Sequence, residues 1–398
     1  MHSKSYIVNT GIITAIGNNA TVCLQSLQKG ESGISYPSIL KTHWQDTFPV
    51  GEVKMSNAEL AAFTGIHEQL PRTALLSAIA VQEAWAPYRH EVGNLRVGFF
   101  SANTVGGMDL TEAVYDAVKN GVVKEHHAQL KYHECGAVTE AVRRYFQLDG
   151  FCTTLSTACS SSANSIMMAA QMIEQDLLDV AIAGGADALS RFTLNGFNTL
   201  MILDKQPCRP FDQERQGLNL GEGAGYVLLM NERAMKQYQV TPICTVSGYA
   251  NANDAYHQTA SSPEGIGNKL AMSHALHKSG LQPQQIDYIN LHGTGTANND
   301  SSEGKAIEVL FDGQIPAASS TKAFTGHTLG AAAGVEAVFS TWAIREGIIF
   351  PNLRWQHAME DISWQPVTSL RTQQPVRHVL SNSFGFGGNC STLIFSKT

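Results

Sequence analysis

A change from a strand pattern to a helix pattern around Cys159 limits the possible folds of this chain more than any other feature. Residues Phe151 to Leu155 form an apolar, β-branched run typical of a strand. A segment of small residues follows, and Ile166 to Ile173 carry a helical pattern. We therefore expect Cys159 at a sharp turn where a strand enters a helix. The helix dipole and the unpaired N–H groups at such a position favour the thiolate, which is the nucleophilic form.

A free cysteine is more often a small buried hydrophobe than a nucleophile. Cys159 alone therefore leaves both interpretations open, and the rest of the chain has to decide between them.

The length of the chain predicts two core-forming halves. A single core usually stops growing at about 250–300 residues, and this chain has 398. The chain starts a second series of elements near residue 245, so we expect an N-terminal half over residues 1–245 and a C-terminal half over residues 246–398. Strands alternate with helices in both, which is typical of an α/β fold with mixed or parallel sheets covered on both faces.

The pattern assigns most of the chain to specific elements, and residues 31–65 look irregular. The expected strands are residues 6–8, 96–101, 151–155, 180–183, 226–230, 286–291, 379–383 and 392–395. The expected helices are residues 20–29, 73–85, 109–119, 137–145, 166–173, 264–279, 302–311 and 329–345.

Composition excludes several functions. The net charge of −7 and the lack of any Lys/Arg-rich run argue against nucleic-acid binding. No apolar run approaches the ~18 residues of a membrane span, and no long apolar segment follows Lys4, so we expect no signal peptide. The seven cysteines form no C-x-x-C pair, which favours reduced thiols in a cytoplasm.

Two histidines stand where strands give way to small-residue segments. His292 follows an apolar strand and opens His-Gly-Thr-Gly-Thr, and His327 follows Thr325-Gly326 and precedes an Ala/Gly-rich helix. The carboxyl ends of strands are where sites form in open α/β sheets. Each histidine by itself is equally compatible with a packing or capping function.

Two further features lie near these histidines in the sequence. Lys322 stands in an otherwise uncharged stretch, and Glu336 on the following helix is a plausible partner, although most such pairs are surface pairs. Residues Asn382 to Asn389 alternate Phe and Gly, which predicts a loop rather than an ordinary strand. Its N–H groups can line an oxyanion hole.

Five motifs in this order resemble those of the elongating β-ketoacyl-acyl carrier protein synthases, condensing enzymes of the thiolase superfamily. The motifs are Thr157-Ala158-Cys159-Ser160-Ser161, Cys208-Arg209-Pro210-Phe211-Asp212, His292-Gly293-Thr294-Gly295-Thr296, Lys322-Ala323-Phe324-Thr325-Gly326-His327 and Asn382-Ser383-Phe384-Gly385-Phe386-Gly387-Gly388. The resemblance covers residues 5 to 396, and its Cys-His-His set matches the elongating branch. The sequence around Cys159 and Asn298-Asn299-Asp300 is closest to synthases of aryl-polyene or type II polyketide pathways.

The resemblance implies the five-layered αβαβα thiolase fold, built from two similar halves and usually dimeric. It implies that Cys159 takes an acyl chain from the phosphopantetheine of an acyl carrier protein, without a free cofactor or a metal. His292 and His327 would then assist decarboxylation of the malonyl thioester and stabilise its enolate.

The resemblance also implies supporting functions for eight further residues. The N–H groups of Cys159 and Phe386 would form an oxyanion hole, and Phe386 would also be a gate. Lys322 would pair with Glu336, and Thr294 and Thr296 would contact the pantetheine. Phe384 would contact the substrate, Val105 would line the acyl pocket, and Arg209 would contact the carrier protein.

Several alternatives remain at this stage. Asn389-Cys390 departs from the usual family pattern, and Cys390 matches a second catalytic cysteine of thiolases only loosely, so we expect it to be structural. The chain is either a homodimeric synthase or the catalytic half of a heterodimer with a chain-length-factor-like paralogue. A non-catalytic subunit, a cysteine hydrolase and a zinc site of Cys159 with the two histidines are the competing interpretations.

Overall fold

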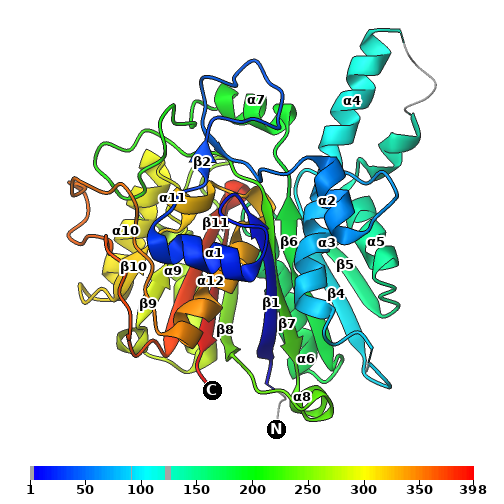
Figure 1. Cartoon of the computed structure of the whole chain (residues 1–398). Coiled ribbons are helices and arrows are strands. Elements are labelled where there is room, and N and C mark those ends of the chain that lie inside the picture. The colour runs from blue at the N-terminus through cyan, green and yellow to red at the C-terminus, as the bar shows by residue number, and fades with distance from the viewer. Residues whose placement is uncertain (1–3, 91, 122–126) are drawn as a thin grey trace.

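The protein is organised around one ten-stranded mixed sheet (Figure 1). The computed structural model describes residues 4–90, 92–121 and 127–398, so a few residues of the predicted N-terminal half lie outside it. The strands of the sheet are β1 Tyr6–Thr14, β4 Val97–Ala102, β5 Phe151–Leu155, β6 Val180–Asp187, β7 Gly223–Met230, β8 Cys244–Asn253, β9 Tyr288–Asn290, β10 Ala317–Ser319, β11 His378–Gly385 and β12 Asn389–Ser396. Strands β2 Ile34–Ser35 and β3 Val50–Gly51 form a small separate pair.

The α-helices of the described residues connect and cover these strands. They are α1 Ala20–Lys29, α2 Asn57–Thr64, α3 Arg72–Trp85, α4 Met108–Lys119, α5 Cys135–Tyr145, α6 Ser161–Glu174, α7 Arg191–Thr199, α8 Glu232–Tyr238, α9 Ile266–Ser279, α10 Ala297–Leu310, α11 Lys322–Thr325 and α12 Ala332–Glu346. None of these helices has the length and apolarity that crossing a membrane requires.

The two halves of the sheet have the same topology. The order is β1-β7-β6-β4-β5 in one half and β8-β12-β11-β9-β10 in the other, which is first, fifth, fourth, second and third strand in both. The pattern of antiparallel and parallel neighbours is also the same. Only two residue pairs, Tyr6 with Thr245 and Ile7 with Cys244, join the halves through β1 and β8. The expectation of two similar halves is confirmed.

Helices complete five layers. Helices α3 and α5 cover the outer face of the N-terminal half-sheet, and α9 and α10 cover that of the C-terminal half-sheet. Helices α6 and α12 contact each other and strands of both halves, and they form the central layer (Figure 1). The expected αβαβα arrangement is therefore present, and its largest apolar core lies around the two central helices.

Most expected elements are present, and the differences have local causes. Helix α1 begins after Asn19, whose side chain accepts the N–H of Val22, and ends at Gly30 with φ of 72°. Residues 31–65 are not wholly irregular, because a capping box of Ser56 and Glu59 starts α2.

Other expectations were wrong in extent. Helices α7, α8 and α11 were not expected, and residues 382–385 belong to β11 rather than to a loop. The second series of elements, expected to start near residues 240–245, starts at Cys244 with β8. The predicted boundary after residue 245 thus falls inside β8, and the division into 1–245 and 246–398 stays a prediction.

The central layer is held by a close approach of α12 to β7 and α6. A Cβ on Gly334 would lie 2.4 Å from the carbonyl oxygen of Gly225, so only glycine fits at this contact. The N–H of Gly334 lies in the first turn of α12, where it has no partner within the helix, and it donates to Ser162 Oγ of α6 at 2.8 Å. One residue therefore contacts both neighbours of α12.

We expect Gly334→Ala to lower the free energy of unfolding by about 1–3 kcal/mol, because the added methyl group overpacks this contact. The matched control is Gly196→Ala in α7, where a Cβ meets nothing within 4 Å. Denaturant unfolding of both variants measures the difference. Equal stability of Gly334→Ala and the unsubstituted protein would contradict the description of this contact.

Candidate active site

Four strand ends of the two halves meet at one site. Cys159 follows β5, His292 follows β9, His327 follows β10 and α11, and Phe386 follows β11. Strands β5 and β10 are the third strands of their halves and lead to the two central helices, α6 and α12. The repeated topology thus brings Cys159 and His327 together, although 168 positions separate them in the sequence.

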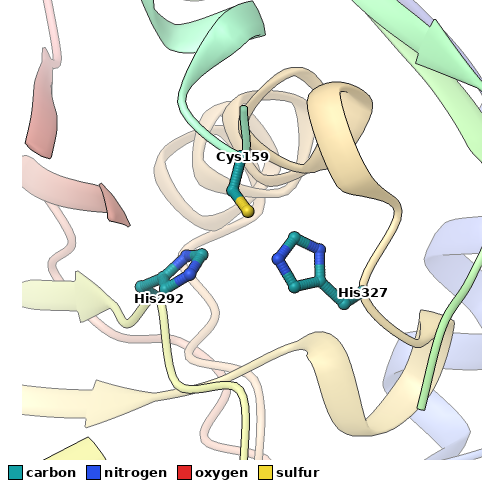
Figure 2. A group of neighbouring side chains, drawn as sticks. All are labelled: Cys159, His292 and His327. Carbon is teal, nitrogen blue, oxygen red and sulfur yellow. The ribbon is translucent and has the colours of Figure 1, made fainter. Parts of the chain in front are cut away.

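The thiol and the two imidazoles face one another (Figure 2). One potential ligand atom from each of Cys159, His292 and His327 lies within 4.8 Å of the others. The imidazole rings are 5.4 Å apart and nearly perpendicular, and each of the three residues is at most 8% exposed. The three residues that the motifs predicted are therefore brought together at a largely buried site.

Cys159 lies on a strained turn. Ala158 has a φ of 54°, which is unusual for a residue other than glycine. The hydroxyl of Ser161 accepts from the N–H of Thr157 at 2.8 Å and donates to the carbonyl of Ala158 at 2.6 Å, so it stabilises the turn. Helix α6 starts two residues after the cysteine, as expected.

The thiol itself is less acidic than the sequence suggested. Burial raises the pKa of Cys159 to about 11, although the charge of Lys322 and the N–H groups of Phe386 and Cys159 itself lower it. The expectation that the helix start makes this cysteine a thiolate was therefore wrong. Burying the negative charge raises the pKa by more than the nearby positive charge and N–H groups lower it.

The tautomer of His292 is determined by Lys322. The ammonium nitrogen lies 3.2 Å from His292 Nδ1, 2.6 Å from the His292 carbonyl oxygen and 2.5 Å from Glu336 Oε1. An ammonium group only donates, so Nδ1 accepts and the imidazole hydrogen is on Nε2. Burial and then the charges of Lys322 and His327 hold the pKa of His292 well below its usual value, so the ring is neutral.

A backbone N–H group determines the tautomer of His327. The N–H of Leu329 donates to His327 Nδ1 at 3.1 Å, which again leaves the hydrogen on Nε2. Leu329 has a φ of 53°, so the donor is held by a strained backbone. Burial and then Lys322 lower the pKa of His327. The site thus has two neutral imidazoles, each with an Nε2–H donor.

A cavity of about 310 Å³ gives access to these groups. Its lining includes Cys159, His292, His327, Thr294, Thr296, Phe384 and Phe386 among the predicted residues. Lys322 and Glu336 lie buried behind His292. Val105 and Arg209 are outside the lining: Val105 is in an apolar cluster with Leu329, and Arg209 pairs with Glu214 at 3.3 Å.

Sequence reasoning missed several residues of the site. Phe197 of α7 stacks on Phe386, with ring centroids 5.8 Å apart. Glu303 accepts the N–H groups of His292 and Gly293, and Asp300 accepts that of Thr294 at 3.0 Å, so two buried carboxylates hold the loop after β9. The acidic residues at the start of α10 were visible in the sequence, but their partners were not.

The arrangement does not fit zinc. A zinc-bound histidine usually donates its second ring N–H to a carboxylate or carbonyl. Here both Nδ1 atoms accept hydrogen bonds, and one of them faces the ammonium of Lys322.

Cys390 lies outside the cavity lining. Its buried thiol donates to Asn268 Oδ1 at 3.2 Å.

Comparison with known proteins identifies the family. Residues 6–234 match the beta-ketoacyl synthase N-terminal domain, and residues 243–356 match the beta-ketoacyl synthase C-terminal domain. The chain belongs to the β-ketoacyl synthase family. It is 30% identical over 413 aligned residues to a 3-oxoacyl-[acyl-carrier-protein] synthase 2 of Coxiella burnetii, covering 98% of each protein. A Staphylococcus aureus protein of the same name is 27% identical, covering 100% of this chain and 99% of the relative.

Two solved structures with high similarity are ketosynthases described with a chain length factor. The ishigamide ketosynthase/chain length factor has a TM-score of 0.92 at 25% identity, with 100% of both chains covered. The ketosynthase ApeO of Xenorhabdus doucetiae, solved in complex with its chain length factor ApeC, has a TM-score of 0.86 at 31% identity. That comparison covers 100% of this chain and 98% of the solved chain.

We expect both imidazoles to be neutral Nε2–H tautomers at pH 6, where a histidine of ordinary pKa is about three quarters protonated. Because burial and Lys322 lower both pKa values, the neutral form persists as the pH falls through 6.5. Nitrogen-15 NMR of histidine-labelled protein reports the form, and His292→Gln and His327→Gln assign the signals. An imidazolium or an Nδ1–H tautomer at pH 6 would contradict the hydrogen bonds described.

Proposed function

We propose that this synthase transfers an acyl chain from an acyl carrier protein to Cys159 and then extends it. The extension is a decarboxylative Claisen condensation with malonyl-carrier protein, which gives 3-oxoacyl-carrier protein and CO2. The observation that carries this proposal is the pair of neutral Nε2–H imidazoles facing the thiol of Cys159 in one cavity.

In the first step the sulfur of Cys159 attacks the acyl thioester, and the pantetheine thiol leaves with the proton. The N–H groups of Cys159 and Phe386 both favour negative charge at Cys159, and in the proposal they donate to the carbonyl oxygen of the acyl group as it becomes an oxyanion. Because such a donor pair is already in place, it needs no reorganisation when the charge forms. Each donor lowers the free energy of the transition state by about 3–4 kcal/mol.

In the second step the malonyl thioester takes the place of the first carrier arm. Its carbonyl oxygen accepts hydrogen bonds from His292 Nε2 and His327 Nε2, which stabilises the enolate as the carboxyl group leaves as CO2. The enolate carbon then attacks the acyl carbonyl on Cys159, and the cysteine sulfur leaves. Two neutral imidazoles suit this chemistry, because a neutral Nε2–H donates a hydrogen bond to the enolate oxygen, whereas a charged imidazolium is acidic enough to protonate the enolate carbon.

The other predicted residues support these steps in the proposal. Lys322, held by Glu336, keeps His292 in its donor tautomer. Thr294 and Thr296, whose hydroxyls are 2.9 Å apart, line the cavity where the pantetheine would enter. Phe386 is the gate, with Phe384 lining the cavity behind it.

Two expected contacts lie away from the cavity. Val105 would limit the acyl pocket, and its position beside Leu329 in an apolar cluster supports this. Arg209 would contact the acidic carrier protein, with its side chain 25% exposed.

The partner subunit is a related protein or a second copy. The similarity to ApeO, which was solved with a chain length factor, supports a heterodimer with such a paralogue. All seven cysteines are free, which supports the cytoplasm as the compartment. We propose no free cofactor, since the carrier protein brings both substrates. Native mass measurement after co-expression with a paralogue tests the heterodimer, and a homodimer alone would overturn it.

We expect Cys159→Ala to abolish acylation and to retain decarboxylation of malonyl-carrier protein, because both histidine donors are unchanged. Intact-protein mass measures acylation, and release of CO2 measures decarboxylation. Acylation at another residue of this variant would contradict the assignment. Release of free acid by the unsubstituted protein, without malonyl-carrier protein, would indicate a hydrolase instead.

We expect His292→Ala and His327→Ala to retain acylation of Cys159 and to reduce condensation by about 10²-fold or more, since each removes one oxyanion donor. Single-turnover measurements of acylation and condensation separate the two effects. A variant that lost acylation but still condensed a preloaded acyl group would show that the two steps are divided differently.

A further inference from the structure

The turn that carries Cys159 and the turn that carries Phe386 come from different halves of the chain and lie in close approach. The Cys159 N–H belongs to the turn after β5, and the Phe386 N–H belongs to the turn between β11 and β12. An oxyanion accepts from both only if their spacing is maintained. Some contact between the halves must therefore fix one turn against the other.

Asn389 is placed to make this contact. It pairs with Gly385 and so closes the turn that carries Phe386. Its side-chain Oδ1 accepts from Ser160 Oγ at 2.6 Å, and Ser160 directly follows the nucleophile. The same oxygen accepts from Asn251 Nδ2 of β8 at 2.7 Å, so the carboxamide is held from its own half as well.

A small polar network continues from Asn389 to the start of α6. Asn164 Nδ2 donates to Thr157 Oγ1 at 2.8 Å and to Asn389 Oδ1 at 3.2 Å. Ser391 Oγ donates to Asn164 Oδ1 at 2.8 Å, but it does not touch the nucleophile turn. Asn389 is thus the member of the C-terminal half that reaches the residue next to Cys159.

The two turns also meet at Gly385, in a van der Waals contact that does not fix their relative rotation. A Cβ on Gly385 would lie 3.1 Å from the Cys159 nitrogen and 3.3 Å from Ala158 Cβ, so the two turns are in close approach. Such a contact limits how near they come but does not fix their rotation. The hydrogen bond from Ser160 to Asn389 supplies the missing direction.

We propose that Asn389 is a positioning residue for acyl transfer, which holds the Phe386 N–H in register with the Cys159 N–H. This inference rests on the proposed function and adds a specific determinant of its first step. Asn389 touches neither substrate nor thiol in this account. Its loss displaces one oxyanion donor and leaves the two imidazoles in place, because Lys322 and Leu329 hold them independently.

The test compares two steps in Asn389→Ala. We expect single-turnover acylation of Cys159, followed by intact-protein mass, to slow by about tenfold or more, a part of the roughly 10²–10³-fold loss when a donor is removed. Decarboxylation of malonyl-carrier protein should change by less than about twofold, since it uses the histidines. A merely structural effect would lower both rates together.

Two variants control the comparison. Asn389→Asp keeps an acceptor oxygen for Ser160 and should restore much of the acylation rate. Ser391→Ala removes a hydroxyl of the same network and strand without touching Ser160, and it should acylate normally. If Asn389→Ala does not fold, Asn389→Gln takes its place, because it keeps the amide but moves its oxygen by one methylene.

The outcomes separate the inference from the proposed function. Normal acylation by Asn389→Ala, or an equal loss of both steps, overturns the positioning function and leaves the synthase proposal intact. An unsubstituted protein that neither acylates Cys159 nor condenses overturns both. Selective loss of acylation with recovery in Asn389→Asp supports the inference.

Discussion

The site depends on a layer of two helices that the half-sheets share. Helices α6 and α12 follow equivalent strands of the repeated topology, and the hydrogen bond between Gly334 and Ser162 joins their starts. Cys159 lies just before α6 and His327 lies shortly before α12, so the shared layer brings the two residues to one place. Neither half contains a complete site, so a change in the packing of this layer would alter the spacing of the nucleophile and its partners.

Burial and charge set the protonation states of the two histidines and of Cys159. Burial lowers the pKa of both histidines, and the charge of Lys322, which donates to His292 and Glu336, lowers it further, so both rings are neutral donors. The same burial raises the pKa of Cys159 despite that positive charge. In the proposed mechanism, acyl transfer therefore relies on donors that stabilise the charge formed during attack, more than on a thiolate present beforehand.

The patterns in the sequence marked Cys159, His292 and His327 as candidates, because strand patterns and small residues stand beside them, and the resemblance to the synthase motifs then decided between a packing and a reacting function. The same resemblance predicted two similar halves, but their common strand order was not visible in the sequence itself. Helix α7 and its Phe197 were missed because a short polar helix has little periodicity. Asn389 and Ser160 are 229 positions apart, so no local pattern joins them. The thiol pKa was misjudged because burial is a property of the folded chain.

The most direct test of the central claim is reconstitution with a series of acyl-carrier proteins and malonyl-carrier protein, with products identified by mass and CO2 measured in parallel. The account predicts 3-oxoacyl-carrier protein two carbons longer than the acyl donor, with one CO2 released for each condensation. The same experiment defines the acyl chain length that the enzyme accepts. Free acid without extension, or extension by Cys159→Ala, would contradict the account.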